Sequence, residues 1–388
     1  MNYVRMPIEI ESPEQLGYDR VRYNLTESSL TDARLQDLWP DLGLDQALRE
    51  LVLCYSDHRG HVDLRTLIAQ QSSVELPKAA TSLSADDVLV TPGAALALFI
   101  VSTTLLERGD HLIVVRPNYA TNIETPRALG ADISYLDLRF EDGWRLDVDR
   151  LRQALRPTTR LVSLTTPHNP TGTVLPREDL HAVLSLLEGH GAYLLVDETY
   201  REMAFSDTPP VAATLSQRAI SVSSMSKTFG LPGIRMGWLL TRDAGLSERF
   251  LAAKEQIVIT NSVVDEAIAL RYLSRKAQHL PRIQAHIQQH LGIVRAWLSD
   301  PTTAALIECV EPQGGVVCFP RVRDVQGISI DDFYRTLNQR YQTYVGPGHW
   351  FEQERRYMRI GFGWPSTDDL KTGLQNVTRA LLDVRGAA

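Results

Sequence analysis

The chain has 388 residues, of which 44% are hydrophobic and 22% charged, so it is long enough for a large buried core and more than one domain. A formal net charge of −7 argues against a nucleic-acid-binding protein, which would normally carry a basic surface. No apolar run has the length of a signal peptide or a membrane span, so we expect no membrane partner and a cytoplasmic location. Three cysteines without metal-ligand spacing predict neither a disulfide framework nor a metal site.

Short apolar runs rich in β-branched residues alternate with amphipathic stretches from about residue 88 onward. We predict helices at 94–107 and 176–189. The runs predicted to be strands are 88–91, 111–115, 133–138, 160–164, 192–197, 219–223 and 237–240. Strands that are apolar throughout and separated by helices indicate a mostly parallel sheet buried on both faces. The predicted fold class is therefore α/β, with a seven-stranded sheet between helices.

The character of the chain changes near residue 275. A long helix is predicted over 274–299, and strands follow at 316–320 and 358–362. This pattern indicates a smaller α+β domain after the large one. The residues before position 35 lack a clear period and are predicted to form an arm that packs with the small domain. The expected parts are the arm (1–35), the large domain (36–275) and the small domain (276–388).

The most informative segment follows the strand predicted at 219–223. It reads Ser224-Met-Ser226-Lys227, and Arg235 comes eight residues after the lysine. An amine nucleophile, two hydroxyls and a guanidinium suit a ligand with an aldehyde at one end and a phosphate at the other. Pyridoxal 5'-phosphate (PLP), held by a lysine Schiff base, is such a ligand. Taken alone, the segment also fits a surface lysine in a serine-rich turn.

Other residues suited to this ligand follow the neighbouring predicted strands. Gly93 opens a helix whose free N–H groups would attract a phosphate. Asp197 ends an apolar strand, where a carboxylate needs a cationic partner such as the pyridinium nitrogen of PLP. Asn169, in Asn-Pro-Thr-Gly, offers an amide to the phenolic oxygen of the ring, and Tyr200 is close enough in sequence to reach the same oxygen.

Three further residues lie near these in the sequence pattern. Tyr119 follows a predicted strand and offers an aromatic face to a cofactor ring, although tyrosines in loops are common. His168 is expected to be a solvated neighbour of the site. Arg359 suits the α-carboxylate of an amino acid, because arginine binds carboxylates bidentately. Ligands of such sheets bind in the crevice at the carboxyl ends of the strands, so we expect one shared site.

In their order and spacing these motifs resemble those of the fold-type I PLP enzymes of the class I/II aminotransferase superfamily. The resemblance runs from Tyr55 to Arg359. It rests on Asn-Pro-Thr-Gly at 169–172, Asp-x-x-Tyr at 197–200, and Ser-x-Ser-Lys with its later arginine at 224–235. Each motif is moderately specific, and their joint order is much more so.

The resemblance implies a role for each cofactor-facing residue. Lys227 would form the Schiff base with PLP and then move the Cα proton of the substrate. Asp197 would pair with the ring nitrogen, and Tyr119 would stack on the ring. Asn169 and Tyr200 would bind the ring oxygen. Lys227, Asp197 and Tyr200 are the expected catalytic residues.

The resemblance also implies phosphate, substrate and subunit contacts. Arg359 and Asn169 would bind the substrate carboxylate. Ala95 stands where many relatives have a hydroxyl, so one phosphate hydrogen bond is expected to be missing. Tyr55 resembles the tyrosine that reaches the phosphate of the neighbouring subunit, which implies a homodimer with shared active sites. The expected phosphate-binding groups are Ser224, Ser226, Arg235, Gly93 and the amides of Ala94 and Ala95.

The motifs do not choose between the reactions that this machinery supports. Transamination between an L-amino acid and a 2-oxo acid is the expected activity. Glu27, in the arm, lies where the family's substrate-proximal segment runs, which favours a cationic substrate side chain. The segments at 313–320, 345–348 and 359–362 are similar to capreomycidine synthase-like members. An elimination or cyclisation of a basic amino acid in specialised metabolism is therefore the alternative.

Two alternative functions, from other classes of protein, have less support in the sequence. Ser224 to Lys227 also spells the Ser-x-x-Lys motif of penicillin-binding proteins, but no Lys-Thr-Gly follows it. A regulator with an aminotransferase-like domain would need a DNA-binding domain, and the arm is too short for a helix-turn-helix.

Overall fold

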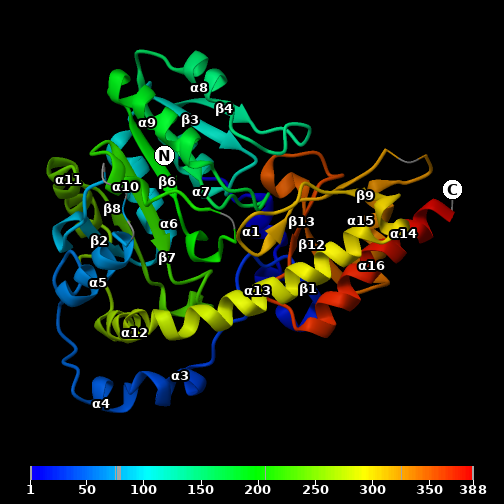
Figure 1. The fold of residues 1–388 in the computed structure, drawn as a ribbon, viewed down its shortest axis with the longest axis horizontal. Coiled ribbons are helices and arrows are strands. Elements are labelled where there is room, and N and C mark those ends of the chain that lie inside the picture. Colours follow the sequence, from blue (N-terminus) through cyan, green and yellow to red (C-terminus); the bar gives the residue numbers. More distant parts are fainter. Residues whose placement is uncertain (1, 75, 77–79, 206, 325, 387–388) are drawn as a thin grey trace.

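A seven-stranded sheet forms the centre of the computed structural model, which describes residues 2–74, 76, 80–205, 207–324 and 326–386 (Figure 1). The strand order is β2-β8-β7-β6-β5-β3-β4. Only β8 runs antiparallel to its neighbours. The sheet confirms the predicted fold class, and its strands are β2 (Val88–Thr91), β3 (His111–Arg116), β4 (Asp132–Asp137), β5 (Thr159–Thr165), β6 (Tyr193–Asp197), β7 (Ala219–Ser224) and β8 (Gly237–Leu240).

Helices cover both faces of this sheet, which explains why its strands are apolar throughout. On β6, Leu194 and Val196 pack against one set of helices, whereas Leu195 faces the other. The first set is α8 (Val148–Ala154), α9 (Arg177–His190) and α10 (Ala212–Leu215). The second set is α6 (Gly93–Leu105), α7 (Thr121–Leu129) and α11 (Ala244–Glu255).

A four-stranded sheet forms a second, smaller layer, in the order β1-β12-β13-β10. Its first strand comes from the arm, because Leu25 pairs in parallel with Val345. The strands are β1 (Tyr23–Leu25), β12 (Thr343–Pro347), β13 (Met358–Gly361) and β10 (Val317–Cys318). A two-stranded ribbon joins β9 (Ile307–Glu308) to β11 (Arg321–Val322). The boundaries proposed between the parts of the chain stay predictions.

One long helix, α13 (Lys276–Ser299), runs from the large sheet to the small one and lies beside the C-terminal helix α16 (Thr367–Gly386) (Figure 1). The helix predicted over 274–299 matches α13 closely. The strand predicted over 316–320 is longer than β10. Helices α14 (Pro301–Ala304) and α15 (Ile330–Gln339) complete this side of the molecule.

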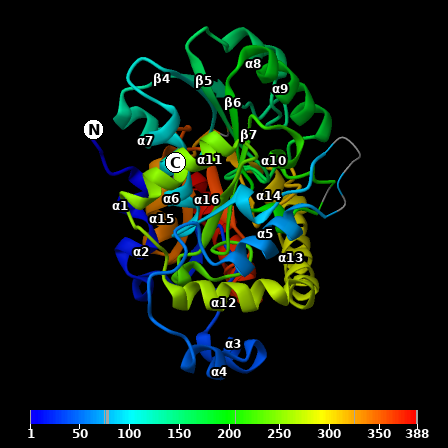
Figure 2. The same cartoon turned by 90° about the vertical axis from the view of Figure 1, so that its left-hand side faces the viewer.

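The remaining helices surround the first strand of the sheet and the arm. Both views show α3 and α4 projecting beyond α12 (Figures 1 and 2). The longer helices are α3 (Leu35–Leu42), α4 (Leu44–Arg49), α5 (Val62–Ser72) and α12 (Val263–Ser274). The arm holds α1 (Pro7–Glu11), α2 (Pro13–Leu16) and η1 (Tyr18–Arg20). Short 3-10 turns are η2 (Ala85–Asp87), η3 (Arg201–Met203), η4 (Pro232–Ile234) and η5 (Gly348–Phe351).

None of the helices in the described part of the chain is both long and apolar enough to cross a membrane. Within the same ranges, no group of His, Cys, Asp and Glu side chains is placed to hold a metal ion.

Candidate active site

A cavity of about 320 Å³ lies at the carboxyl edge of the seven-stranded sheet, between the sheet, the arm and β13. Its volume falls in the range of small-ligand sites. Most of the site residues expected from the sequence line it together. They are Glu27, Ala94, Ala95, Tyr119, Asn169, Asp197, Tyr200, Ser224, Ser226, Lys227, Arg235 and Arg359.

Lys227 follows the end of β7 and is mostly buried in this cavity. Within the described ranges its ammonium makes no hydrogen bond or ion pair. Burial lowers the pKa of Lys227, and the nearby carboxylate of Glu27 opposes that shift. A lysine with a depressed pKa and no partner is more readily the neutral, nucleophilic amine. Its backbone is fixed to the arm, because the N–H of Leu30 donates to the Lys227 carbonyl at 3.1 Å.

Asp197, the last residue of β6, is a buried carboxylate with one oxygen in use. Its Oδ1 accepts hydrogen bonds from the hydroxyl of Thr199 at 2.6 Å and from the Thr199 N–H at 3.1 Å. Burial raises the pKa of Asp197, and the two bonds from Thr199 act against that rise. Its Oδ2 has no hydrogen-bond partner among the described residues, so a cation or N–H donor in the cavity would meet a free acceptor there.

The N-terminus of α6 and Arg235 form a cradle suited to an anion. A Cβ on Gly93, whose φ is +80°, would lie 2.5 Å from Nη2 of Arg235, so only glycine leaves room for the guanidinium. A Cβ on Gly237 would lie 2.6 Å from the amide nitrogen of Ala94. Strand β8 therefore passes close to the start of α6. Free N–H groups beside a fixed cation attract phosphate. The hydroxyls lining the cavity near this cradle are those of Ser224 and Ser226.

Arg359, on β13, places a buried guanidinium opposite the sheet edge. Its Nη1 donates to Oδ1 of Asn169 at 3.0 Å, and its Nη2 donates to the Thr26 carbonyl at 2.6 Å. Its Nε is buried and has no partner in the described part of the chain. Burial lowers the pKa of Arg359, while Tyr200 and Glu27 oppose the shift. A buried, incompletely paired guanidinium is a natural place for a carboxylate.

Two donors near Arg359 point toward the same space. Because the Asn169 oxygen is occupied by Arg359, the amide N–H groups of Asn169 are left to donate. The Tyr200 hydroxyl donates to Oγ of Ser28 at 3.0 Å. Burial raises the pKa of Tyr200 to about 12, so its phenol stays protonated near neutral pH.

The arm supplies the opposite wall of the cavity. Besides Glu27, the wall includes Glu14 on α2 and Glu9 on α1. Ser28 and Thr199 also belong to the site, through the bonds given above. Glu9, Glu14, Ser28 and Thr199 were not among the site residues expected from the sequence. Only Thr199 had a signal, since an Asp followed two residues later by Thr often forms a local side-chain turn.

The environment of His168 differs from the one expected from the sequence. The residue was expected to be solvated, but it is 4% exposed, and its Nδ1 lies 2.8 Å from the hydroxyl of Thr171. Burial lowers the pKa of His168 to about 4, so it is neutral near pH 7. The prediction was wrong because the loop folds back on itself: the His168 N–H donates to the Thr173 carbonyl at 2.8 Å, and the Gly172 N–H donates to the His168 carbonyl at 2.7 Å.

Tyr55 lies elsewhere. Its side chain is 80% exposed, and it does not line the cavity of its own chain. Its expected contact with the phosphate in a neighbouring subunit stays a prediction.

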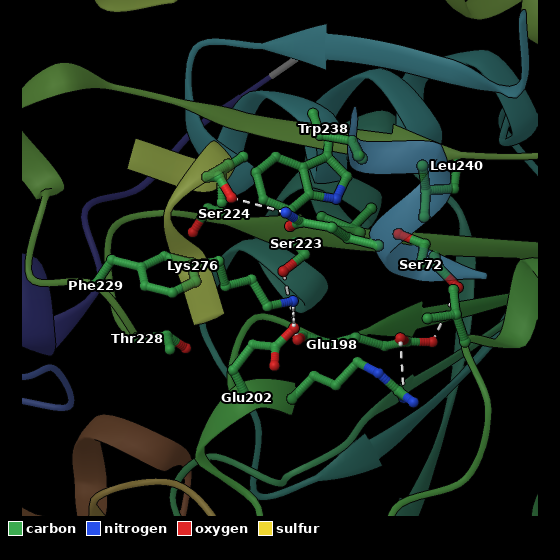
Figure 3. A pocket seen from close by; sticks show the side chains of 17 residues that line it. Ser72, Glu198, Glu202, Ser223, Ser224, Thr228, Phe229, Trp238, Leu240 and Lys276 are labelled. Atoms are coloured by element: carbon green, nitrogen blue, oxygen red, sulfur yellow. Dashed lines mark hydrogen bonds and ion pairs between the residues drawn. The ribbon is translucent and has the colours of Figure 1, made fainter. Parts of the chain in front are cut away.

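A second cavity, of only about 50 Å³, lies behind β7 (Figure 3). It is too small for an amino acid. Oε1 of Glu198 accepts from the Ala212 N–H and from the Ser221 hydroxyl, each at 2.9 Å. Glu202 forms an ion pair with Lys276, the first residue of α13. These contacts tie the segment after Asp197 to the long helix and thereby support the site from behind.

Comparison with known proteins identifies the class of enzyme to which this fold and this cavity belong. The chain belongs to the family "Aminotransferase class I and II", whose sequence model matches residues 25–377. The family and its structures make the protein a PLP-dependent transferase.

Individual relatives add detail. The chain is 30% identical to capreomycidine synthase of Streptomyces vinaceus over 296 residues, which is 76% of this chain and 74% of that protein. It is 32% identical to arginine–pyruvate transaminase AruH of Pseudomonas aeruginosa over 189 residues, 48% of this chain and 47% of that protein. A PLP-dependent aminotransferase from Streptococcus suis has a TM-score of 0.88 at 27% identity, covering 99% of both chains.

Proposed function

We propose that the protein is an aminotransferase that moves the amino group of an L-amino acid to a 2-oxo acid, with PLP attached to Lys227. One observation carries the proposal. A single cavity holds three groups: the Lys227 amine and Oδ2 of Asp197, neither of which has a partner among the described residues, and the cradle formed by the N-terminus of α6 and Arg235. These are the three kinds of group that an aldehyde, a protonated ring nitrogen and a phosphate require.

The chain offers one partner for each part of the cofactor. When bound, PLP supplies an electron sink that makes the Cα proton of an amino acid acidic. Asp197 would accept the ring N–H, Tyr119 would stack on the ring, and Asn169 and Tyr200 would donate to the ring oxygen. Ser224, Ser226, Arg235 and the amides of Ala94 and Ala95 would bind the phosphate. For Tyr200 to donate there, its hydroxyl turns away from Ser28 or Ser28 rotates to donate to it.

The substrate would lie between Arg359 and Lys227. Arg359 binds the α-carboxylate, with Asn169 fixing the guanidinium through the 3.0 Å bond. The amine of Lys227 would accept the proton from the substrate Cα and give it to another carbon. The lowered pKa of Lys227 suits this role, because a general base works best when it is largely unprotonated at the working pH.

The active form is proposed to be a homodimer. Support comes from an exposed apolar segment in which Val52, Leu53 and Tyr55 are 72%, 79% and 80% exposed. Large apolar side chains gathered at the surface are typical of interaction sites. Tyr55 would then complete the phosphate site of the other subunit.

The second candidate function is elimination or cyclisation of a basic amino acid. The observation that favours it is the 30% identity with capreomycidine synthase over most of both chains. Both functions begin with removal of the Cα proton by Lys227, so the site residues serve either one.

Incubation of the PLP-loaded enzyme with a panel of amino acids, with and without a 2-oxo acid, separates the two by mass spectrometry. Transamination gives the oxo acid of the donor and requires the acceptor for turnover. Loss of water or ammonia without an acceptor supports the second function. A panel in which no amino acid is converted would refute both.

A further inference from the structure

The cavity holds more negative charge than the cofactor site explains. Its cations are Lys227, Arg235 and Arg359. Its carboxylates are Asp197, Glu9, Glu14 and Glu27. In the proposed function, PLP and the substrate carboxylate take up all three cations and Asp197. The three carboxylates of the arm then have no counter-ion among the described residues, on the wall that a substrate side chain would face.

Glu27 is held in place but not neutralised. It follows β1, and its Oε1 accepts from Nδ2 of Asn24 at 3.3 Å and from the hydroxyl of Tyr18 at 3.4 Å. The Tyr18 ring stacks on Trp364, with 6.1 Å between ring centroids. No hydrogen bond from the described residues reaches Oε2 of Glu27. One oxygen therefore orients the carboxylate while the other stays available.

Glu14 faces the same space from α2. It is exposed, lines the cavity, and makes no hydrogen bond or ion pair in the described part of the chain. Burial raises the pKa of Glu27, the charge of Glu14 raises it further, and Lys227, Arg359 and Asn24 oppose the rise. Two carboxylates close enough to repel each other gain most from a cation placed between them.

Glu9 is different, because its Oε2 accepts from the Met6 N–H at 2.9 Å. That bond closes the first turn of α1, so Glu9 already has a structural partner.

The position of Glu27 fits the path of a substrate side chain. Arg359 donates to the carbonyl of Thr26, the residue just before Glu27. Lys227 and Arg359 are both near enough to influence Glu27 electrostatically. A substrate held by its carboxylate at Arg359, with its Cα beside Lys227, would have its side chain in the cavity that the arm closes.

Resting on the proposed function, we propose that Glu27 and Glu14 bind the positively charged end of the substrate side chain, so that the enzyme selects a basic amino acid. Glu27 is the main determinant because it is oriented and partly buried. Glu14 contributes less because it is exposed and screened by water. Neutral side chains of the same length would leave both carboxylates unpaired.

Arginine and citrulline test this inference, since they share nearly the same shape and differ by one charge. The readout is the change in the absorbance band of bound PLP after mixing with amino acid alone, which both candidate reactions produce. We expect Glu27→Gln to lower kcat/KM for arginine about 10- to 100-fold and to leave citrulline nearly unchanged. Glu14→Gln should lower it about 2- to 5-fold. Glu50→Gln, an exposed carboxylate on the C-terminal side of α4, is the matched control and should change neither substrate.

Binding without chemistry gives a second readout. The desamino analogue of arginine keeps the carboxylate and the guanidinium but cannot react, and the corresponding analogue of citrulline is its neutral match. Calorimetry on the PLP-loaded enzyme should show tighter binding of the charged analogue, by about 10-fold or more, and loss of that difference in the double variant.

The inference is overturned if citrulline reacts as well as arginine, if glutamate is preferred, or if the double variant keeps the preference. Failure of the proposed function looks different. In that case no amino acid changes the PLP band, while the two analogues still report whether the arm carboxylates select a cation. A variant that has lost its fold is recognised because it loses citrulline and PLP binding as well.

Discussion

The two walls of the cavity are built in different ways. The sheet wall consists of residues at the ends of buried strands, such as Asp197 on β6 and Lys227 after β7. The arm wall consists of Glu14 and Glu27, carried by a four-residue helix and by the residues after a three-residue strand. In the proposed function, the sheet wall holds the groups that any PLP reaction needs. The arm wall holds the groups that would distinguish one side chain from another.

The walls also differ in how firmly they are fixed. Oδ1 of Asp197 accepts two hydrogen bonds, whereas Glu14 makes none with described residues. The arm is tied to the rest of the molecule at several points besides its bonds to Lys227, Tyr200 and Arg359. One is Glu11, which accepts from the indole N–H of Trp350 at 2.8 Å. Another is the pairing of β1 with β12. Replacing the side chain of Glu14 or Glu27 can therefore alter selection, whereas a shift of the arm backbone would also reach Lys227 and Tyr200 through Leu30 and Ser28.

The largest effect is expected from Lys227→Ala. Turnover should fall by at least about 10⁴-fold, because the variant loses both the attachment point and the proton carrier. PLP should still bind, since the phosphate cradle and Asp197 remain, but it should not be covalently attached. Steady-state assays and dialysis of the loaded protein measure the two effects. Activity near that of the wild type would refute the assignment of Lys227.

Asp197→Asn should have the next largest effect. It keeps the shape of the side chain but removes the charge that holds the ring nitrogen protonated, so kcat should fall about 10²- to 10³-fold. Asp207→Asn, an exposed carboxylate outside the cavity, is the control and should be neutral. A kcat within a few fold of the wild type would show that Asp197 does not pair with the ring nitrogen.

Gly361→Ala should affect the arm wall most directly. A Cβ at this position of β13 would lie 1.7 Å from the carbonyl oxygen of Glu27, so the arm backbone must move. Overpacking of this kind costs about 1 to 3 kcal/mol, and kcat/KM for the preferred amino acid should fall about 10-fold or more. PLP affinity should fall less than kcat/KM, because the displaced residue is Glu27 rather than Leu30, which bonds to Lys227. Gly292→Ala, in α13 with no atom within 4 Å of the added Cβ, is the matched control. Equal loss of PLP binding in Gly361→Ala would show that the two walls are not independent.

The sheet wall could be predicted from sequence because its signals are local. The strands predicted at 88–91 and 237–240 match β2 and β8, and Asp197 and Lys227 lie where the strand ends place them. The apolar runs and short motifs that determine these positions lie within a few residues of Asp197 and Lys227.

The arm wall could not be predicted in the same way. Glu14 reaches the cavity only because β1 pairs with β12, more than three hundred residues later in the chain, and α2 has too few turns to show a period. Glu27 was placed by resemblance to the family. The burial of His168 depends on how the loop of 166–172 packs, which its polar sequence does not reveal.

The central claim is that Lys227 carries PLP, and borohydride reduction of the loaded protein followed by peptide mass spectrometry tests it most directly. We expect a reduced PLP adduct on Lys227 alone. Lys254 and Lys276 serve as internal controls, because the first donates to the His58 carbonyl and the second is paired with Glu202. An adduct on another lysine, or no adduct in a protein that binds PLP, would contradict the account.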